Sequence, residues 1–170
     1  MTLCQTITLD FDQEMKSTRK MLERIVLDDA TKSLKPHPKS MSLQRLATHV
    51  AELPGWIKLA LEADNFDLPA DFKPALANSN TELLGIFDQA AEGSAQAIAV
   101  VKDEDMGKNW SFSFAGQHVF TSVRTDVIRS FINHLVHHRG QLSVYLRLQD
   151  VPVPGMYGPS ADDGWPPAAA

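Results

Sequence analysis

Apolar side chains recur every three or four residues along four segments of the chain, which is the spacing of one face of an α-helix. The segments run from about residue 9 to 27, 42 to 63, 80 to 102 and 121 to 149. Typical capping residues precede the apolar stripe of the second and third segments, namely Ser42 and either Asn80 or Thr81. Four amphipathic helices of this length predict an all-α protein, a four-helix bundle.

The segments between these helices have a different character. Trp110, Phe112 and Phe114 alternate with serines, and a possible turn separates them from residues 118–120, which predicts a short β-hairpin before the last helix. Residues 28–41 and 64–79 are rich in residues that favour loops, and residues 151–170 form an extended tail of one domain that spans residues 1–170. Pro54 should kink or end the second helix, because proline has no backbone N–H.

Composition narrows the range of functions. The 170 residues carry a formal net charge of -5, and Lys and Arg are scattered, which disfavours a nucleic-acid groove. Charges interrupt every apolar stretch before the roughly 20 residues that a membrane span needs. The N-terminal residues show no basic leader followed by an apolar run, so we expect no signal peptide. A single cysteine, Cys4, excludes an internal disulfide and favours a cytoplasmic protein.

Histidines are concentrated in the last predicted helix. Three of the six histidines of the chain are His134, His137 and His138. At 100° per residue, His134 and His138 lie one turn apart in the middle of the apolar stripe, whereas His137 lies on its flank. His134 and His138 are therefore the pair that would face the core together.

Two buried imidazoles are costly unless each ring nitrogen finds a partner, and a divalent metal ion can be that partner. A zinc-like site needs at least three protein ligands. His49 is the favoured third ligand because it lies within the second helix, whereas His37 is flanked by prolines in a loop. Glu52, about one turn after His49, is a further ligand, a hydrogen-bond acceptor or a general base. The alternative is that these histidines are core residues bonded to the backbone, or a pair on a solvated face.

Two motifs of the chain are similar to those of a known family. The run HLVHHRGQLSVYLR, at residues 134–147, and the VPVPGMYGPSADD that follows at 151–163 resemble the C-terminal signature of the DinB/YfiT-like family. The run KPHPKSMSLQRLATHVAEL, at residues 35–53, resembles the second-helix region of that family. The resemblance implies a four-helix bundle, often a homodimer, in which His49, His134 and His138 bind a divalent metal ion.

The resemblance also implies an activity, because characterised relatives include transferases and isomerases that activate glutathione, mycothiol or bacillithiol. We therefore expect a thiol-dependent S-transferase or isomerase with a small-molecule substrate. Zn or Ni are the favoured metals, and Fe, Mn and Co also suit three imidazoles. A metal-dependent hydrolase and a non-catalytic, stress-associated metal-binding bundle are the alternatives.

Further roles are expected for residues near the histidines. Glu52 is a candidate to carry a proton. Arg139 is a candidate to hold an anionic group, although a solvated charge on the helix face is the favoured interpretation. Tyr157, in the tail, either folds over an opening or packs on the surface.

Overall fold

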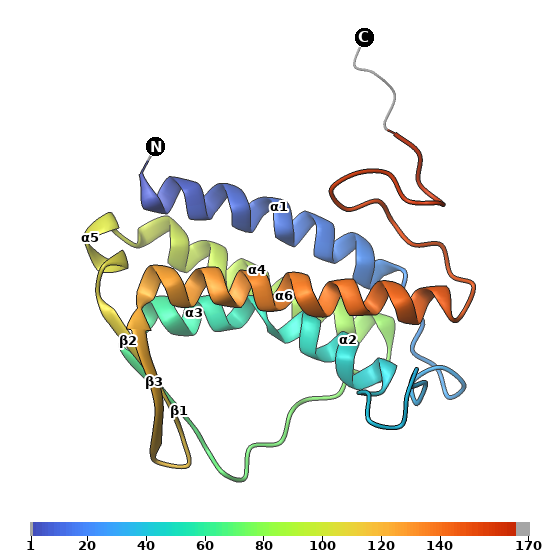
Figure 1. The fold of residues 1–170 in the computed structure, drawn as a ribbon, viewed down its shortest axis with the longest axis horizontal. Coiled ribbons are helices and arrows are strands. Elements are labelled where there is room, and N and C mark those ends of the chain that lie inside the picture. The colour runs from blue at the N-terminus through green and yellow to red at the C-terminus, as the bar shows by residue number, and fades with distance from the viewer. Residues whose placement is uncertain (1, 166–170) are drawn as a thin grey trace.

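The protein is mostly helical and carries a small sheet. The computed structural model describes residues 2–165. Its helices are α1 (Leu3–Glu23), α2 (Leu43–Glu52), α3 (Pro54–Glu62), α4 (Asn80–Val100), α5 (Asp103–Met106) and α6 (Arg124–Arg147), and its strands are β1 (Asn65–Leu68), β2 (Asn109–Phe114) and β3 (Gln117–Val123). The long helices lie side by side, and the sheet projects below one end of them (Figure 1). The expected all-α class with a short hairpin therefore holds only in part, because three strands pair into a sheet beside the helices.

The ends of the helices are set by capping residues. The first helix begins at Leu3, earlier than residue 9, because Thr2 and Gln5 cap each other reciprocally. The third predicted helix begins at Asn80 as expected, but its cap is Ser79, whose hydroxyl accepts from the Glu82 N–H at 3.1 Å. Within residues 2–165, no helix combines the length and hydrophobicity that a bilayer-spanning segment requires.

The second predicted helix is divided at Pro54, as the sequence indicated. The first part, α2, ends at Glu52, and Pro54 begins α3. Because proline has no N–H, the hydrogen-bond ladder is interrupted between the two. The buried Ser94 hydroxyl of α4 fixes the beginning of α3, donating to the Pro54 carbonyl at 2.6 Å and accepting from the Lys58 N–H at 3.1 Å. This break leaves His49 in the last turn of α2.

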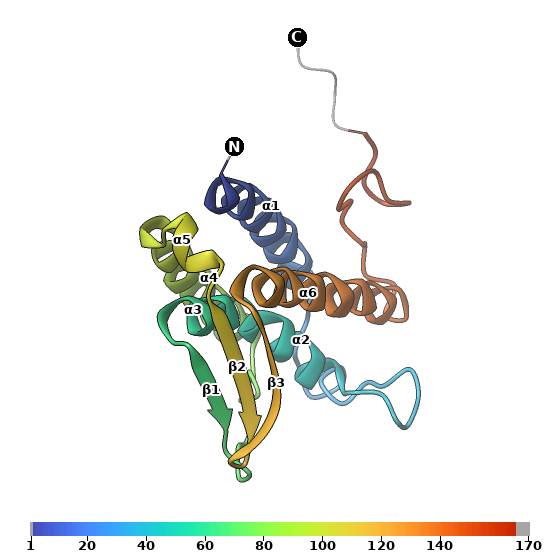
Figure 2. The ribbon, with the colours of Figure 1, turned by 60° about the vertical axis from the view of Figure 1, so that its left-hand side comes forward.

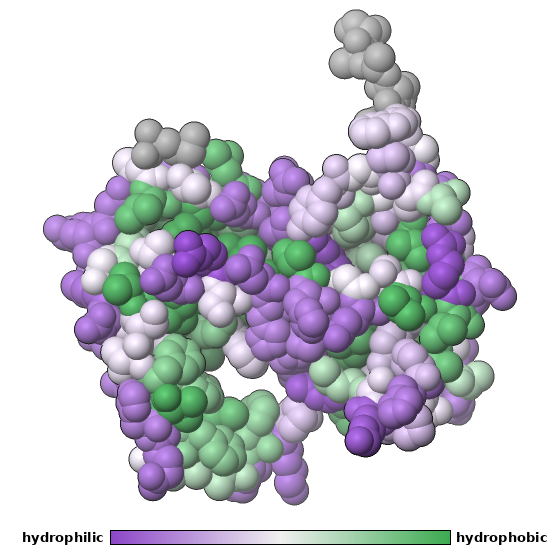
Figure 3. All heavy atoms as spheres, in the orientation of Figure 1, coloured by the Kyte–Doolittle hydropathy of each residue, from purple (hydrophilic) through white to green (hydrophobic). Residues whose placement is uncertain are grey.

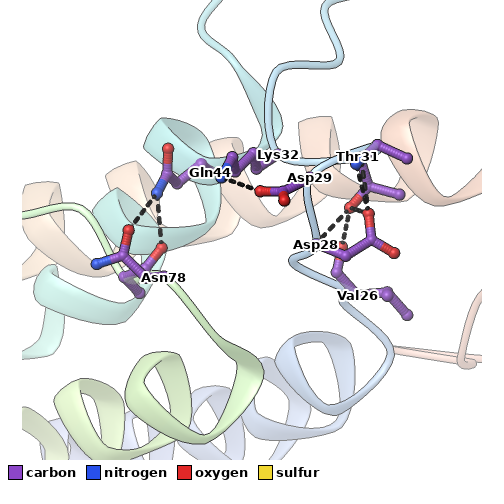
Figure 4. A network of polar contacts seen from close by, with 9 residues as sticks. Val26, Asp28, Asp29, Thr31, Lys32, Gln44 and Asn78 are labelled. Atoms are coloured by element: carbon purple, nitrogen blue, oxygen red, sulfur yellow. Dashed lines mark hydrogen bonds and ion pairs between the residues drawn. The ribbon is translucent and has the colours of Figure 1, made fainter.

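Two loops hold α2 in place, although both have the composition of irregular segments. Gln44 donates its side-chain amide to the Ala77 carbonyl at 2.9 Å and contacts the Asn78 side chain at 3.3 Å (Figure 4). The buried Thr48 hydroxyl accepts from the Ala77 N–H at 3.0 Å. On the other side, the N–H groups of Leu43 and Gln44 donate to carbonyls of residues 34 and 32 at 2.9 and 3.1 Å, in a loop where the Asp28 carboxylate closes a turn with Thr31 (Figure 4). The helix that carries His49 is thus bonded to the segment before α4.

The sheet has one expected and one unexpected part. The β2–β3 hairpin confirms the predicted one, and its turn uses left-handed conformations at Ala115 (φ 51°) and Gly116 (φ 74°). The short strand β1 was not expected, because its four residues lie in a segment rich in loop-forming residues. It pairs with β2 in parallel and is tied to the hairpin turn, where the Asp67 carboxylate accepts from the Gly116 N–H at 3.1 Å. Figure 2 shows the three strands side by side beneath α3 and α6.

Arg139 joins α6 to α1 inside the protein. Only 2% of Arg139 is exposed, so the expectation of a solvated charge is wrong. Its guanidinium forms an ion pair with Glu14 at 2.6 Å and donates to the Thr18 hydroxyl at 3.0 Å. The Tyr157 hydroxyl of the tail lies 2.7 Å from Arg139 and 2.9 Å from Glu14. The tail thus reaches back to α1 and α6 through the Tyr157 hydroxyl. Residues 166–170 of the predicted tail lie outside the described residues.

Replacing Arg139 with methionine should destabilise the fold, because it leaves the Glu14 carboxylate buried without its partner. The expected loss in the free energy of unfolding is about 3–5 kcal/mol, measured by urea denaturation of the metal-free protein. The matched control is Arg129→Met, since Arg129 pairs with Asp126 on the surface, and its stability should not change measurably. Equal stability of the two variants would contradict this account of Arg139.

Candidate metal centre

The three histidines singled out in the sequence lie together between two helices. His49 comes from α2, and His134 and His138 come from α6. The Nε2 atom of His134 lies 3.4 Å from Nε2 of His49 and 2.8 Å from Nε2 of His138. One ring nitrogen of each histidine lies within 4.8 Å of the other two. The arrangement is that of three donors converging on one point.

The donor set fits a divalent metal ion. A tetrahedral ion bound at 2.0–2.1 Å places its nitrogen ligands about 3.3 Å apart, a value that lies between the separations of 2.8 and 3.4 Å given above. Burial, followed by the neighbouring His138 and His49, lowers the pKa of His134 to about 4. Burial also lowers the pKa of His138. Both rings are thus neutral near pH 7, as metal ligands must be.

Gln141 fixes the orientation of the His138 ring. Its side-chain oxygen lies 2.8 Å from Nδ1 of His138, and its side-chain nitrogen lies 3.1 Å from Nε2 of His137. Since the Gln141 oxygen can only accept, Nδ1 of His138 carries the proton and Nε2 is left free toward His134. His137, which is exposed on the flank as predicted, holds the Gln141 amide in this orientation.

Glu52 lies behind His49. Its carboxylate is 3.9 Å from Nδ1 of His49, which is longer than a hydrogen bond, and 3.2 Å from the Arg45 guanidinium. The Nδ1 atom of His49 is buried and has no hydrogen-bond partner among the described residues. Burial alone would raise the pKa of the Glu52 carboxyl, but the nearby His49 and Arg45 outweigh burial and lower it. Glu52 is therefore an ionised group on the opposite side of the ring from His134, where it can orient His49.

The structure brings together some of the predicted residues and separates others. Glu52 adjoins the histidines, whereas the guanidinium of Arg139 is bound to α1 and the tail. Gln141 and Arg45 were not singled out in the sequence. Gln141 lies three residues after His138 and four after His137, and this helical spacing was the available signal. The sequence carried no comparable signal for Arg45, because its contact with Glu52 spans seven residues along a helix.

Trp56 forms one side of the centre. Its ring centroid lies 5.8 Å from that of His49 and 5.5 Å from that of His134, with edge-to-face geometry in both contacts. Trp56 belongs to α3, so the break at Pro54 separates it from the ligand helix. The histidine cluster therefore has an aromatic neighbour on one side and the Glu52–Arg45 pair on another.

Replacing Gln141 with leucine should weaken zinc binding by about 10–100-fold, because His138 loses the acceptor that fixes its tautomer. Competition with a chelating dye measures the affinity of the purified variant. Gln96→Leu is the control, because the one hydrogen bond of the Gln96 side chain within residues 2–165 is to Glu92, and the zinc affinity of this variant should equal that of the wild type. An unchanged affinity of Gln141→Leu would show that Gln141 does not orient the ligand.

The metal-free protein should lose stability as the pH falls from about 6.5 to about 4. His134 has a pKa near 4 when folded and near 6.5 when unfolded, so below pH 6.5 the unfolded chain binds the extra proton. The stabilising effect is complete above pH 6.5 and declines through this window. Melting temperatures are measured between pH 6.5 and pH 4 in the presence of a chelator. Over this range, the melting temperature of His134→Gln should fall less than that of the wild type. Identical pH profiles would contradict the lowered pKa.

Proteins of the DinB family resemble this chain in sequence and in fold. The model of the DinB family matches residues 3–167. An uncharacterized protein, YrdA, of Bacillus subtilis (strain 168) is 27% identical over 150 residues, which cover 88% of this chain and 85% of YrdA. The crystal structure of a DinB-like protein from Bacillus cereus ATCC 10987 matches with a TM-score of 0.71 and 22% identity, over 90% of this chain and 97% of that one. A second DinB-like protein, YjoA of Bacillus subtilis, gives a TM-score of 0.65 and 16% identity, over 87% and 96% of the two chains.

The resemblance noted in the two sequence motifs is thus confirmed across the chain. The family model extends from the beginning of α1 to beyond α6, and the matching structures cover nearly the same length. The chain belongs to the DinB family.

Proposed function

We propose that the protein is a divalent-metal-dependent enzyme that transfers a small thiol to an electrophile. The observation that supports this proposal is the convergence of His49, His134 and His138, two of them held neutral by burial. Three protein ligands leave a coordination position for a substrate, which is the usual composition of a catalytic site. Zn or Ni is the proposed metal. A homodimer and a cytoplasmic location remain part of the proposal.

When bound, the metal supplies a Lewis acid that lowers the pKa of a coordinated thiol or water. The residues of the chain do the remaining work. Gln141 keeps the His138 ring aimed at His134 through the 2.8 Å contact to Nδ1, and the Glu52 carboxylate faces Nδ1 of His49 from 3.9 Å. Glu52 is ionised at neutral pH and lies behind His49, so a proton that leaves the thiol reaches its carboxylate through solvent. With a halo-aromatic electrophile, the carbon–sulfur bond forms, the carbon–halogen bond breaks, and halide leaves.

The attacking sulfur must come from a second substrate. Cys4 is the single cysteine of the chain, and it lies at the beginning of α1, where its thiol contacts the Val101 carbonyl at 3.6 Å. Burial and the neighbouring Asp103 raise the pKa of Cys4 to about 11, so this thiol stays protonated. A protonated thiol is a poor nucleophile. This supports a small free thiol as the co-substrate.

The test is turnover of 1-chloro-2,4-dinitrobenzene by protein purified without a nickel column, stripped with a chelator and reloaded with one equivalent of Zn²⁺ or Ni²⁺. Glutathione, bacillithiol and mycothiol are supplied in turn, and ester and amide substrates are assayed in parallel. We expect turnover only when both metal and a thiol are present. His134→Ala should lose metal and activity together, because a ligand is missing, whereas His37→Ala, a change in an exposed loop, should retain both.

Two results would contradict the proposal. Turnover of the ester or amide at the same rate with and without a thiol would identify a hydrolase. Tight metal binding without turnover of any substrate would identify a non-catalytic metal-binding protein. Glu52→Gln separates two roles of the carboxylate: loss of turnover with full metal occupancy supports proton transfer, and loss of metal supports orientation of His49.

A further inference from the structure

An apolar pocket lies between the sheet and the helices. Its volume is about 250 Å³, and all the residues that line it are aromatic or leucine. In Figure 3, hydrophobic residues gather over the sheet at the lower left, beside an opening between the sheet and the helical part. Among the residues that the structure describes, no charged side chain lines this pocket. The pocket therefore excludes charge by its composition.

One wall of the pocket is a row of rings across the sheet. Phe66, Phe112 and Phe120 occupy paired positions on the three strands. The centroids of Phe66 and Phe112 are 6.3 Å apart with their planes at 24°, and those of Phe112 and Phe120 are 5.9 Å apart. These strands present ring faces and edges at spacings that aromatic groups prefer. The wall is thus suited to a flat ring.

The opposite wall is shared with the histidine cluster. Trp56 and Phe131 line the pocket, with ring centroids 5.5 Å apart at 81°. The same Trp56 ring contacts His49 and His134 edge to face. Phe131 lies one turn before His134 on α6. A group in the pocket is therefore separated from the candidate metal ligands by the thickness of one side chain.

Size and polarity together define the occupant. A cavity of about 150 Å³ in another protein stays dry and binds benzene, so 250 Å³ accommodates a substituted ring or two fused rings. A charged or strongly polar group would lose its hydration there without compensation. The polar end of such a molecule must therefore lie outside this pocket.

We propose that this pocket binds a planar aromatic group of the electrophilic substrate, whose reactive centre then lies at the histidine cluster. The identification of the occupant as a substrate rests on the proposed function. The binding of an aromatic group to the pocket does not, and the experiments below keep the two apart.

Benzyl alcohol and cyclohexylmethanol are the matched probes, observed by saturation-transfer NMR with the full-length, metal-free protein. Cyclohexylmethanol is the more hydrophobic of the two, so a pocket that selects on hydrophobicity alone would bind it more tightly. We expect benzyl alcohol to bind more tightly by about 2–10-fold, from ring–ring contacts. Equal or reversed affinities would overturn the aromatic assignment, and absence of binding by both would overturn the site.

Leu59→Trp tests the location of the probe. Leu59 lies at the edge of the pocket and is 40% exposed, so a larger side chain there fills the opening while leaving the core intact. We expect at least tenfold weaker binding of benzyl alcohol. The control is Leu9→Trp, an exposed leucine of α1 that does not line the pocket, with unchanged binding. Phe72→Ala, at an exposed position of the rim, is a second variant that should weaken binding severalfold.

Binding that is insensitive to Leu59→Trp and Phe72→Ala would overturn the proposal. Probe binding without any turnover would defeat the proposed function and leave the pocket assignment standing. If turnover of the halo-aromatic substrate occurs, benzyl alcohol should inhibit it competitively, and Leu59→Trp should raise the KM for that substrate more than it lowers kcat. Turnover without such inhibition would overturn the assignment of the pocket to the substrate while preserving the proposed function.

Discussion

The structure depends on holding ring nitrogens from two helices within bonding reach of a common point. His49 and His134 are 85 residues apart in the sequence, yet their Nε2 atoms are 3.4 Å apart. An error of one ångström in the position of either helix would remove one donor. The bonds from Thr48 and Gln44 to the segment before α4 fix α2. The ion pair of Arg139 with Glu14 fixes α6 against α1.

Two polar side chains on α6, one buried and one half-buried, serve opposite purposes because their partners differ. Arg139 finds a carboxylate, a hydroxyl and a carbonyl on α1, so its charge is satisfied within the protein. His134 faces two other imidazoles and no acid, so burial favours its neutral form. A satisfied charge stabilises a fold, whereas neutral imidazoles facing one another form a site that a cation completes. Neighbouring turns of α6 thus carry Arg139, which joins helices, and His134, which belongs to the histidine cluster.

The elements that carry long periodic patterns were predictable from the sequence. The apolar stripes gave the helices, the break at Pro54 followed from its missing N–H, and the alternation of Trp110, Phe112 and Phe114 gave the hairpin. The strand β1 was not predictable, because its four residues form a strand only by pairing with β2. The helical wheel placed His134 and His138 correctly on the inner face. It could not reveal the partners of Arg139, because the first helix and the tail supply them.

The break at Pro54 has a consequence for how this protein can diversify. The His49 ligand stands on one side of the break, and Trp56, with the edge of the aromatic pocket, stands on the other. Ser94 anchors the second piece to α4 independently of the bonds that anchor the first. Mutations of α3 residues other than Trp56, such as Leu59, can therefore reshape the pocket edge without disturbing the helix that carries His49. Descendants of this chain can thus vary the shape of the pocket while inheriting the same three converging histidines.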